Sequence, residues 1–104
     1  MKRADELYKA VLCLQNLEEA QRFFRDLLTE SEIVEFSNRW QVARMLSEGV
    51  SYAKIEQETG MSSTTIARIN KWLQNGKNGY KLALDRLHHH QPYPAGERTD
   101  EVSS

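Results

Sequence analysis

The sequence of 104 residues has a single cysteine, Cys13, and no long apolar run. One cysteine excludes a framework of intramolecular disulfides and fits a reducing cytosol. No apolar stretch approaches the ~20 residues that a membrane-spanning helix requires. The first nine residues also lack the apolar core of a signal peptide. We therefore expect a soluble protein of the cytoplasm that has no membrane partner.

Cysteine and histidine, two residue types that often carry catalysis, are scarce as well. Catalysis needs a nucleophile, an acid–base pair or a metal cluster gathered in one place. Cys13 stands among apolar residues, and all three histidines are consecutive, at 88–90, where a flexible segment would make a poor metal site. Glu18 and Glu19 fit best as acids at a helix start. We expect no enzyme, no metal site and no cofactor.

The net charge is only −1, but the charge is distributed unevenly along the chain. Residues 1–60 carry 8 basic and 11 acidic side chains, a net charge of −3. Residues 61–86 carry five basic side chains against Asp85 alone, a net charge of +4, and residues 87–104 carry −2. A local excess of positive charge is what a surface facing phosphates needs.

Apolar residues recur at helical spacing and never alternate as in strands, which predicts an all-α fold. The length allows one domain, which we place at 1–87. Residues 88–104 contain two prolines and no apolar period, so we expect a disordered tail there. The expected helices cover 4–16, 17–28, 30–48 and 79–87, with a helix-turn-helix over 51–73.

Local signals mark the helix ends. Asn16 with Glu19, and Thr29 with Glu32, have the spacing of capping boxes. Gly49 is expected to end the longest helix in a left-handed conformation. Ser51 and either Ser62 or Ser63 are expected to cap the two helices of the motif, and Gly76 and Gly79 to mark a bend. The longest helix has an apolar stripe formed by Ile33, Phe36, Trp40, Ala43 and Leu46.

The segment 51–73 predicts a DNA-reading helix-turn-helix. Gly60 stands at the turn, where glycine reaches positive φ without a steric clash. Ile55, Met61, Ile66, Ile69 and Leu73 can face inward, whereas Glu56 replaces the small residue usual at its position. The candidate DNA-contact residues are Lys54, Ser62, Ser63, Thr64, Thr65, Arg68 and Lys71. An ordinary helical corner remains the alternative.

The N-terminal helices carry more apolar side chains than a small monomer can cover. These are Leu7, Val11, Leu12, Leu14, Phe23, Phe24, Leu27 and Leu28. Such a surplus usually meets a partner, which predicts a homodimer. Two alternatives stay open: a compact monomer that buries these residues in one core, and a helical protein-interaction module without DNA binding.

Residues 27–73 resemble the bacterial Trp repressor family, most closely its YerC/YecD-type branch. The resemblance rests mainly on the helix start at Leu28 and Thr29, on Arg39 and Gly49, and on the TTIAR block that ends at Arg68. It extends over most of residues 1–87. It implies an intertwined homodimer of about six helices, which binds double-stranded DNA in successive major grooves and represses transcription.

The resemblance also implies a candidate effector pocket. Thr29, Arg39 and Arg68 match family positions that line the tryptophan pocket, but Ile69 and Trp72 stand where the repressor has a glycine and a serine. The resemblance therefore does not carry tryptophan over as the corepressor, and the effector is unknown.

Two roles for Trp72 are open. Its indole could fill the corepressor cavity against Arg39 or Arg68, or it could pack at the edge of the last helix near Tyr80 or Leu84. In the first helix of the motif, Ala53 and Glu56 occupy positions where the repressor carries basic DNA-contacting residues. We therefore expect a different operator.

Overall fold

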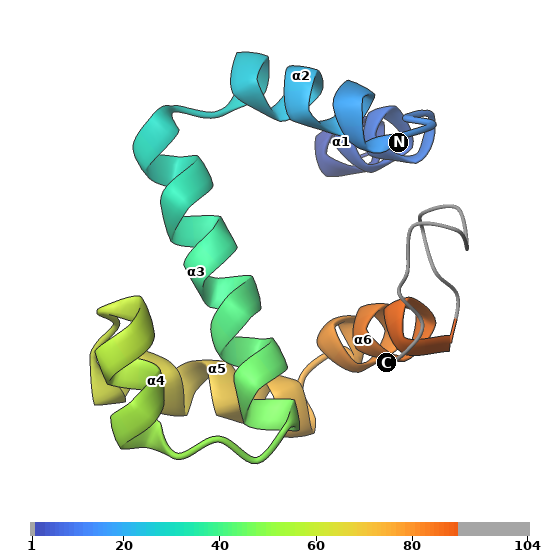
Figure 1. Cartoon of the computed structure of the whole chain (residues 1–104). Helices are drawn as coiled ribbons and strands as arrows, with labels where there is room; N and C mark the ends of the chain where they lie inside the picture. The colour runs from blue at the N-terminus through green and yellow to red at the C-terminus, as the bar shows by residue number, and fades with distance from the viewer. Residues whose placement is uncertain (1, 90–104) are drawn as a thin grey trace. The chain divides into compact units, whose positions relative to one another are not determined.

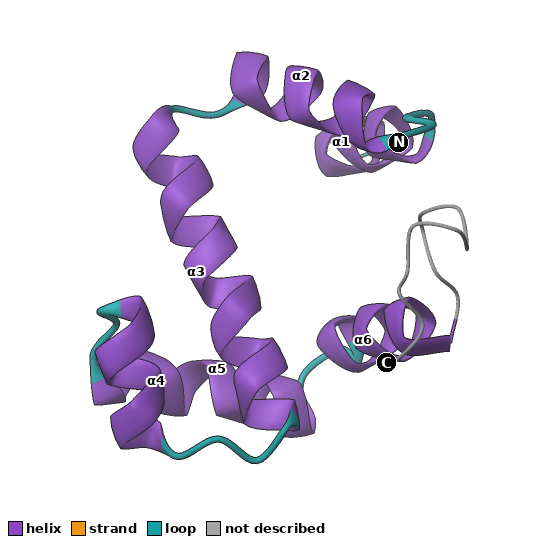
Figure 2. Cartoon of the chain, viewed as in Figure 1, coloured by secondary structure: helices purple, strands orange, loops and turns teal. Residues whose placement is uncertain are grey.

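The computed structural model describes residues 2–89, which form six α-helices and no strand (Figure 1, Figure 2). The helices are α1 (Arg3–Leu12), α2 (Leu17–Leu27), α3 (Glu30–Ser47), α4 (Tyr52–Thr59), α5 (Ser63–Asn75) and α6 (Gly79–His89). The predicted all-α fold is confirmed. Internal packing divides the chain into two compact units, Met1–Ser37 and Asn38–Ser104, and the division falls inside α3. None of the helices within 2–89 has both the length and the apolar character needed to cross a membrane.

The first unit contains both predicted capping boxes. The Asn16 side chain accepts a hydrogen bond from the Glu19 backbone N–H at 2.9 Å, and the Glu19 carboxylate accepts one from the Gln15 N–H at 2.9 Å. Thr29 and Glu32 exchange such bonds reciprocally, at 3.1 and 2.9 Å. These bonds fix where α2 and α3 begin, because each satisfies amides that have no partner within the helix.

Helix α1 is shorter than the predicted 4–16, since it ends at Leu12. The capping box of α2 explains the difference. Asn16 has an extended backbone, with φ −158° and ψ 174°, and the Gln15 N–H is already bonded to Glu19, so neither residue can continue α1. Cys13 is exposed, and its thiol donates to the Ala10 carbonyl at 3.0 Å.

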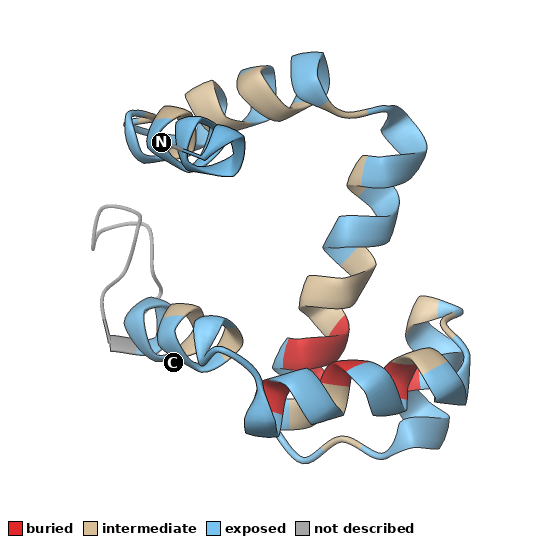
Figure 3. Ribbon diagram, turned by 180° about the vertical axis from the view of Figure 1, so that it is seen from behind, coloured by how far each residue is buried: buried red, intermediate tan, exposed pale blue. Residues whose placement is uncertain are grey.

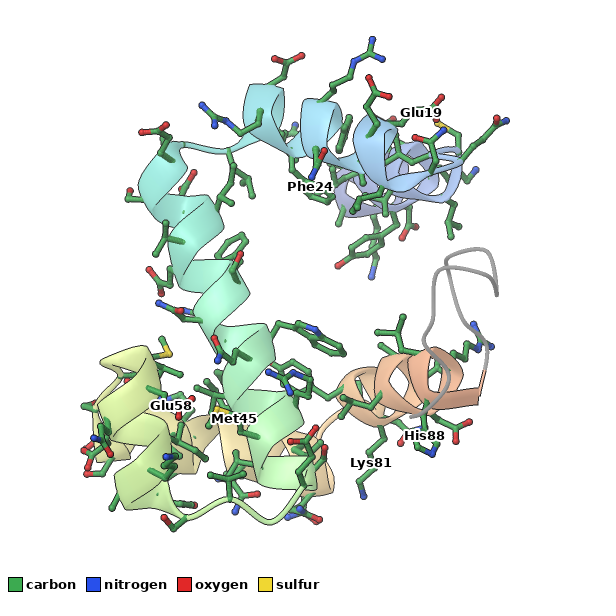
Figure 4. The ribbon with its side chains drawn as sticks, in the orientation of Figure 1. Glu19, Phe24, Met45, Glu58, Lys81 and His88 are labelled. Carbon is green, nitrogen blue, oxygen red and sulfur yellow. The ribbon has the colours of Figure 1, made fainter. Side chains whose placement is uncertain are left out.

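The apolar side chains of α1 and α2 are left largely uncovered, since neither helix contains a buried residue. Leu12 is 81% exposed. Phe23 and Phe24 pack edge to face with ring centroids 5.3 Å apart. Figure 4 shows Phe24 and Glu19 on different sides of α2. The large apolar residues exposed on these helices are Leu7, Tyr8, Leu12, Leu17 and Leu27.

The buried core lies in the second unit, where the C-terminal half of α3 meets α4 and α5 (Figure 3). It contains the residues predicted from the motif, Ile55, Ile66, Ile69 and Leu73, and Met61 packs against its edge. Each large aliphatic side chain buried in this way contributes roughly 1.5–3 kcal/mol of transfer free energy. From α3 the core takes Val42, Ala43 and Met45, of which Met45 is labelled in Figure 4.

The stripe predicted for α3 is only partly correct. Ala43 is buried and Leu46 packs against the core, but Phe36 is 47% exposed. Val42 and Met45, outside the predicted stripe, are buried instead. Helix α3 is apolar on more than one side, so the sequence period does not reveal which side faces α4 and α5. Another side carries Trp40, whose ring lies 6.2 Å from that of Tyr80 in α6.

Besides the turn between α4 and α5, two links between helices depend on positive φ. Gly49 has φ 83° at the end of α3, as predicted. In the bend between α5 and α6 the left-handed residue is Asn78, with φ 67°, rather than Gly76 or Gly79. Helix α6 also runs past the predicted end at 87, so His88 and His89 belong to it. The remainder of the predicted disordered tail, 90–104, lies outside the described residues.

Candidate nucleic-acid interface

Helices α4 and α5 pack against each other and are joined by a short turn (Figure 1). Ser51 caps α4 by accepting a hydrogen bond from the Lys54 N–H at 3.2 Å. Ser62 caps α5 in the same way, accepting from the Thr65 N–H at 3.2 Å. The sequence left Ser62 and Ser63 open as the second cap, and the structure assigns it to Ser62.

The turn between the two helices is closed by Gly60 and Thr59. Gly60 has φ 74° and ψ 3°, a left-handed conformation, and its N–H donates to the Glu56 carbonyl. The Thr59 hydroxyl donates to the Ile55 carbonyl at 2.8 Å and accepts from the Met61 N–H at 3.2 Å. One threonine therefore satisfies backbone groups on both sides of the glycine. Glu56 is exposed, which explains why a large residue is tolerated there.

The outward face of α5 carries the predicted contact residues. Thr64, Arg68 and Lys71 are all exposed, while Ile66, Ile69 and Leu73 on the other side are buried. Helix α5 contains no acidic residue. Within residues 2–89, neither Arg68 nor Lys71 forms an ion pair. Positive charge on this face is therefore not neutralised by a described carboxylate.

The remaining candidate DNA-contact residues differ in their exposure and in their contacts within the protein. Ser62 and Ser63 are exposed, but Thr65 is half-buried and accepts a hydrogen bond from the Ser62 hydroxyl at 3.2 Å. Lys54 on α4 is exposed and paired with Glu58, one turn along, at 3.4 Å. Figure 4 labels Glu58 on that helix. Exposed pairs of this kind contribute little to stability, so Lys54 can exchange Glu58 for another anion at small cost.

A hydrogen bond that sequence reasoning missed links the two helices. The Asn70 side-chain amide donates to the Tyr52 hydroxyl oxygen at 3.2 Å, joining α5 to the first residue of α4 across 18 positions of sequence. Gln74 donates to the other end of the Asn70 amide at 3.4 Å. The sequence shows only that Asn70 and Gln74 are one helical turn apart. That Tyr52 is their partner becomes apparent only in the folded structure, because it is 18 positions away from Asn70.

The five candidate effector-pocket residues have different environments. Ile69 is fully buried in the core of the second unit. Arg39 is half-buried and Arg68 is exposed. Thr29, which belongs to the first unit, has both its N–H and its hydroxyl oxygen bonded to Glu32. Ile69, which the resemblance places where the Trp repressor has a glycine, therefore serves as a core residue in this chain.

Trp72 is 44% exposed on α5. One of its two proposed roles is packing near Tyr80 or Leu84, and the Tyr80 ring contacts the indole of Trp40. The Trp72 carbonyl accepts from the Gly76 N–H at 2.9 Å, and a Cβ at position 76 would lie 2.5 Å from this oxygen. The close approach explains why glycine follows α5.

A groove with a volume of about 530 Å³ lies between the C-terminal half of α3 and α6. Its wall includes the ion pair between Arg44 and Glu48, with a 3.3 Å separation. The lining residues are Trp40, Arg44, Ser47, Glu48, Leu84, Asp85, Leu87 and His88. None of the five candidate effector-pocket residues belongs to this set, so the groove is not the pocket that the resemblance implies. Among the described residues no cluster of His, Cys, Asp or Glu could hold a metal ion.

Comparison with known proteins shows to which family the chain belongs. A family model described as "Trp repressor protein" matches residues 2–88 of the chain. The chain belongs to the Trp repressor family. The resemblance noted in the sequence is thereby confirmed, and it covers all six helices almost completely.

Relatives in this family support the same conclusion. The chain is 49% identical over 86 residues to the uncharacterized protein YerC of Bacillus subtilis (strain 168), covering 83% of each chain. A Staphylococcus aureus crystal structure, provisionally named a Trp repressor, is 48% identical with a TM-score of 0.77, covering 82% of this chain and 85% of that one. A TrpR-like protein from Eubacterium eligens ATCC 27750 is 42% identical, also with a TM-score of 0.77, over 81% and 87% of the two chains. The Trp repressor-like fold is therefore shown by sequence and by structure.

Proposed function

We propose that this protein is a cytoplasmic, sequence-specific DNA-binding regulator that represses transcription as a homodimer, with α4 and α5 acting as a helix-turn-helix. The observation that carries the proposal is the outward face of α5. It presents Thr64, Arg68 and Lys71 over a fully buried stripe, on a helix without acidic residues. Membership of the Trp repressor family supports the same activity.

The chemistry of this face fits both parts of DNA recognition. Arg68 and Lys71 can neutralise phosphates, which provides affinity without reading sequence. Ser63 and Thr64 are exposed at the start of α5, and hydroxyls there can reach base edges once a helix enters the major groove. The buried stripe of Ile66, Ile69 and Leu73 holds α5 against the core, so the face is presented on a fixed support.

The homodimer in this proposal is inferred from the exposed apolar residues of the first unit. The exposed leucines of α1 and α2 form more apolar surface than water-facing helices normally carry. Two copies related by a two-fold axis would bind two half-sites of a palindromic operator. The proposed regulator is not an enzyme and requires no cofactor.

The decisive experiment is selection of genomic fragments by the purified protein, followed by anisotropy titrations on a selected duplex and a scrambled duplex. We expect tighter binding to the selected duplex, with affinity that falls steeply as salt rises because phosphate contacts release counterions. No binding to either duplex at low salt would overturn the proposal. That result would favour a protein-interaction module, for which the exposed apolar residues of α1 and α2 already provide a surface.

A further inference from the structure

In the hydrogen bond between Asn70 and Tyr52, the Tyr52 hydroxyl acts only as an acceptor, so its own O–H donor is not used. The phenolic oxygen accepts from the Asn70 amide at 3.2 Å. A tyrosine hydroxyl can accept and donate at the same time, so its proton is still available. Within residues 2–89 no side chain or carbonyl accepts that proton, and the Tyr52 residue is 37% exposed. The hydroxyl can therefore donate to an acceptor outside the protein.

Asn70 holds this hydroxyl in a defined position. Its oxygen end accepts from the Gln74 amide at 3.4 Å, on the same helix, which turns its NH₂ end toward Tyr52. Asn70 is half-buried between the core and the surface. The phenol of α4 is thus held from α5 by an amide whose orientation is set within α5.

The pair borders the proposed DNA-facing surface. On α5, Ser63, Ala67, Asn70 and Gln74 recur at intervals of four, three and four, so they form one strip along the helix. Thr64 follows Ser63, and Lys71 follows Asn70, by one position, which is about 100° around the helix axis. The strip therefore lies between the outward face with Thr64 and Lys71 and the buried stripe of Ile66, Ile69 and Leu73. The acceptor that DNA would bring to this edge is a phosphate oxygen, because phosphate oxygens receive most protein–DNA hydrogen bonds.

We propose that Tyr52 is a DNA-backbone contact whose hydroxyl donates to a phosphate oxygen, and that Asn70 is its positioning residue. The inference rests on the proposed function and adds to it a neutral contact on α4. A neutral donor contributes affinity without displacing counterions, unlike Lys71.

The test compares Tyr52→Phe with the wild-type protein on the selected and scrambled duplexes over a range of salt. We expect binding to both duplexes to weaken by roughly two- to tenfold, the value of one hydrogen bond, with an unchanged salt slope. Tyr80→Phe on α6 is the matched control, because the Tyr80 hydroxyl makes no hydrogen bond to a described residue and phenylalanine keeps the ring contact with Trp40, and it should bind as the wild type does. Thermal unfolding of each variant confirms that it is folded at the temperature of the titration.

The role of Asn70 is tested by a double-mutant cycle with Asn70→Leu. If Asn70 acts through Tyr52, Asn70→Leu weakens binding in the wild-type background and has little further effect in Tyr52→Phe. Additive losses would overturn the positioning role. Wild-type binding with the expected salt dependence but no loss in Tyr52→Phe would overturn the contact while leaving the proposed function intact. If Tyr52→Phe lowers the melting temperature but leaves DNA affinity unchanged, the hydroxyl has only a structural role, and the proposed contact is overturned as well.

Discussion

Thr64 and Lys71 are both exposed on the outward face of α5, but their chemistry suits different contacts. A lysine ammonium is a point charge that any phosphate satisfies, whereas a threonine offers a hydroxyl and a methyl group to particular base edges. In the proposed regulator, we therefore expect substitutions of Lys71 to change affinity and substitutions of Thr64 to change sequence preference.

Lys71→Ala should weaken binding to all duplexes alike and lower the salt slope by about one, as for the loss of a single phosphate contact. Anisotropy titrations at several salt concentrations measure both quantities. Lys9→Ala, on α1, removes the same charge outside the α4–α5 pair and should leave the slope unchanged. Unchanged affinity and slope in Lys71→Ala would show that the DNA-facing surface has been placed wrongly.

Thr64→Ala should alter the preferred sequence more than the general affinity. We expect a loss of ~1–3 kcal/mol of discrimination at one base position, with binding to scrambled DNA nearly unchanged. Selection from a randomised duplex library, repeated with the variant, measures the preference at each position. An identical preference in Thr64→Ala would remove this residue from the base-reading set.

The effector prediction depends on Ile69 and Trp72. Ile69 is fully buried, at a position where the resemblance implies a glycine in the Trp repressor, and Trp72 brings a second bulky side chain one turn away from Arg68. We therefore expect calorimetry to detect no micromolar binding of L-tryptophan, and DNA affinity to be the same with and without it. Tryptophan binding that strengthens DNA affinity would contradict this prediction.

At the scale of helices, sequence signals that act within one turn predicted the structure well. The capping pairs Asn16–Glu19 and Thr29–Glu32, the caps at Ser51 and Ser62, and the left-handed Gly49 are set by neighbouring residues. Predictions failed where the outcome depended on which elements pack together.

Three residues show this limit. Val42 and Met45 were missed because α3 is apolar on more than one side, and only the packing of α4 and α5 decides which side is buried. Tyr52 was missed because its partner Asn70 is 18 residues away. For the candidate DNA-facing residues, the helical period alone separated Thr64, Arg68 and Lys71 from the buried stripe.

The turn between α4 and α5 gives a stability prediction. Gly60 has φ 74°, and a Cβ in the left-handed region costs about 1–2 kcal/mol. Gly60→Ala should therefore lower the free energy of unfolding by about this amount, a decrease of roughly 4–8 °C per kcal/mol in melting temperature. Calorimetry or circular dichroism against temperature measures the change.

Gly79→Ala is the matched control for this substitution. Gly79 begins α6 without positive φ, and a Cβ there would meet no other atom within 4 Å. Alanine favours helix more than glycine does, so Gly79→Ala should be neutral or stabilising. Equal melting temperatures for Gly60→Ala and the wild type would show that the turn is not under this constraint.

For the whole molecule, the predicted dimer can be tested through Leu12. It is 81% exposed, so its replacement by a polar residue would cost a monomer almost nothing. In a dimer that covers α1, Leu12→Gln should weaken self-association, and light scattering at micromolar concentration should show less of the doubled mass that we expect for the wild type. Glu6→Gln, an exposed polar position on the same helix, should leave the mass unchanged. A wild-type protein that scatters as a monomer would remove the two-fold operator from the proposal.

The placement of the buried core also has a consequence for the order of folding. Every buried residue in the described chain lies between Val42 and Leu73, so the core closes through short loops. Short loops cost little entropy to close, and helical segments with local contacts fold rapidly. The segment that carries the proposed DNA-facing surface should therefore form in a fast step whose rate is independent of protein concentration. If the proposed homodimer forms, burial of α1 and α2 between two copies should follow in a slower, concentration-dependent step.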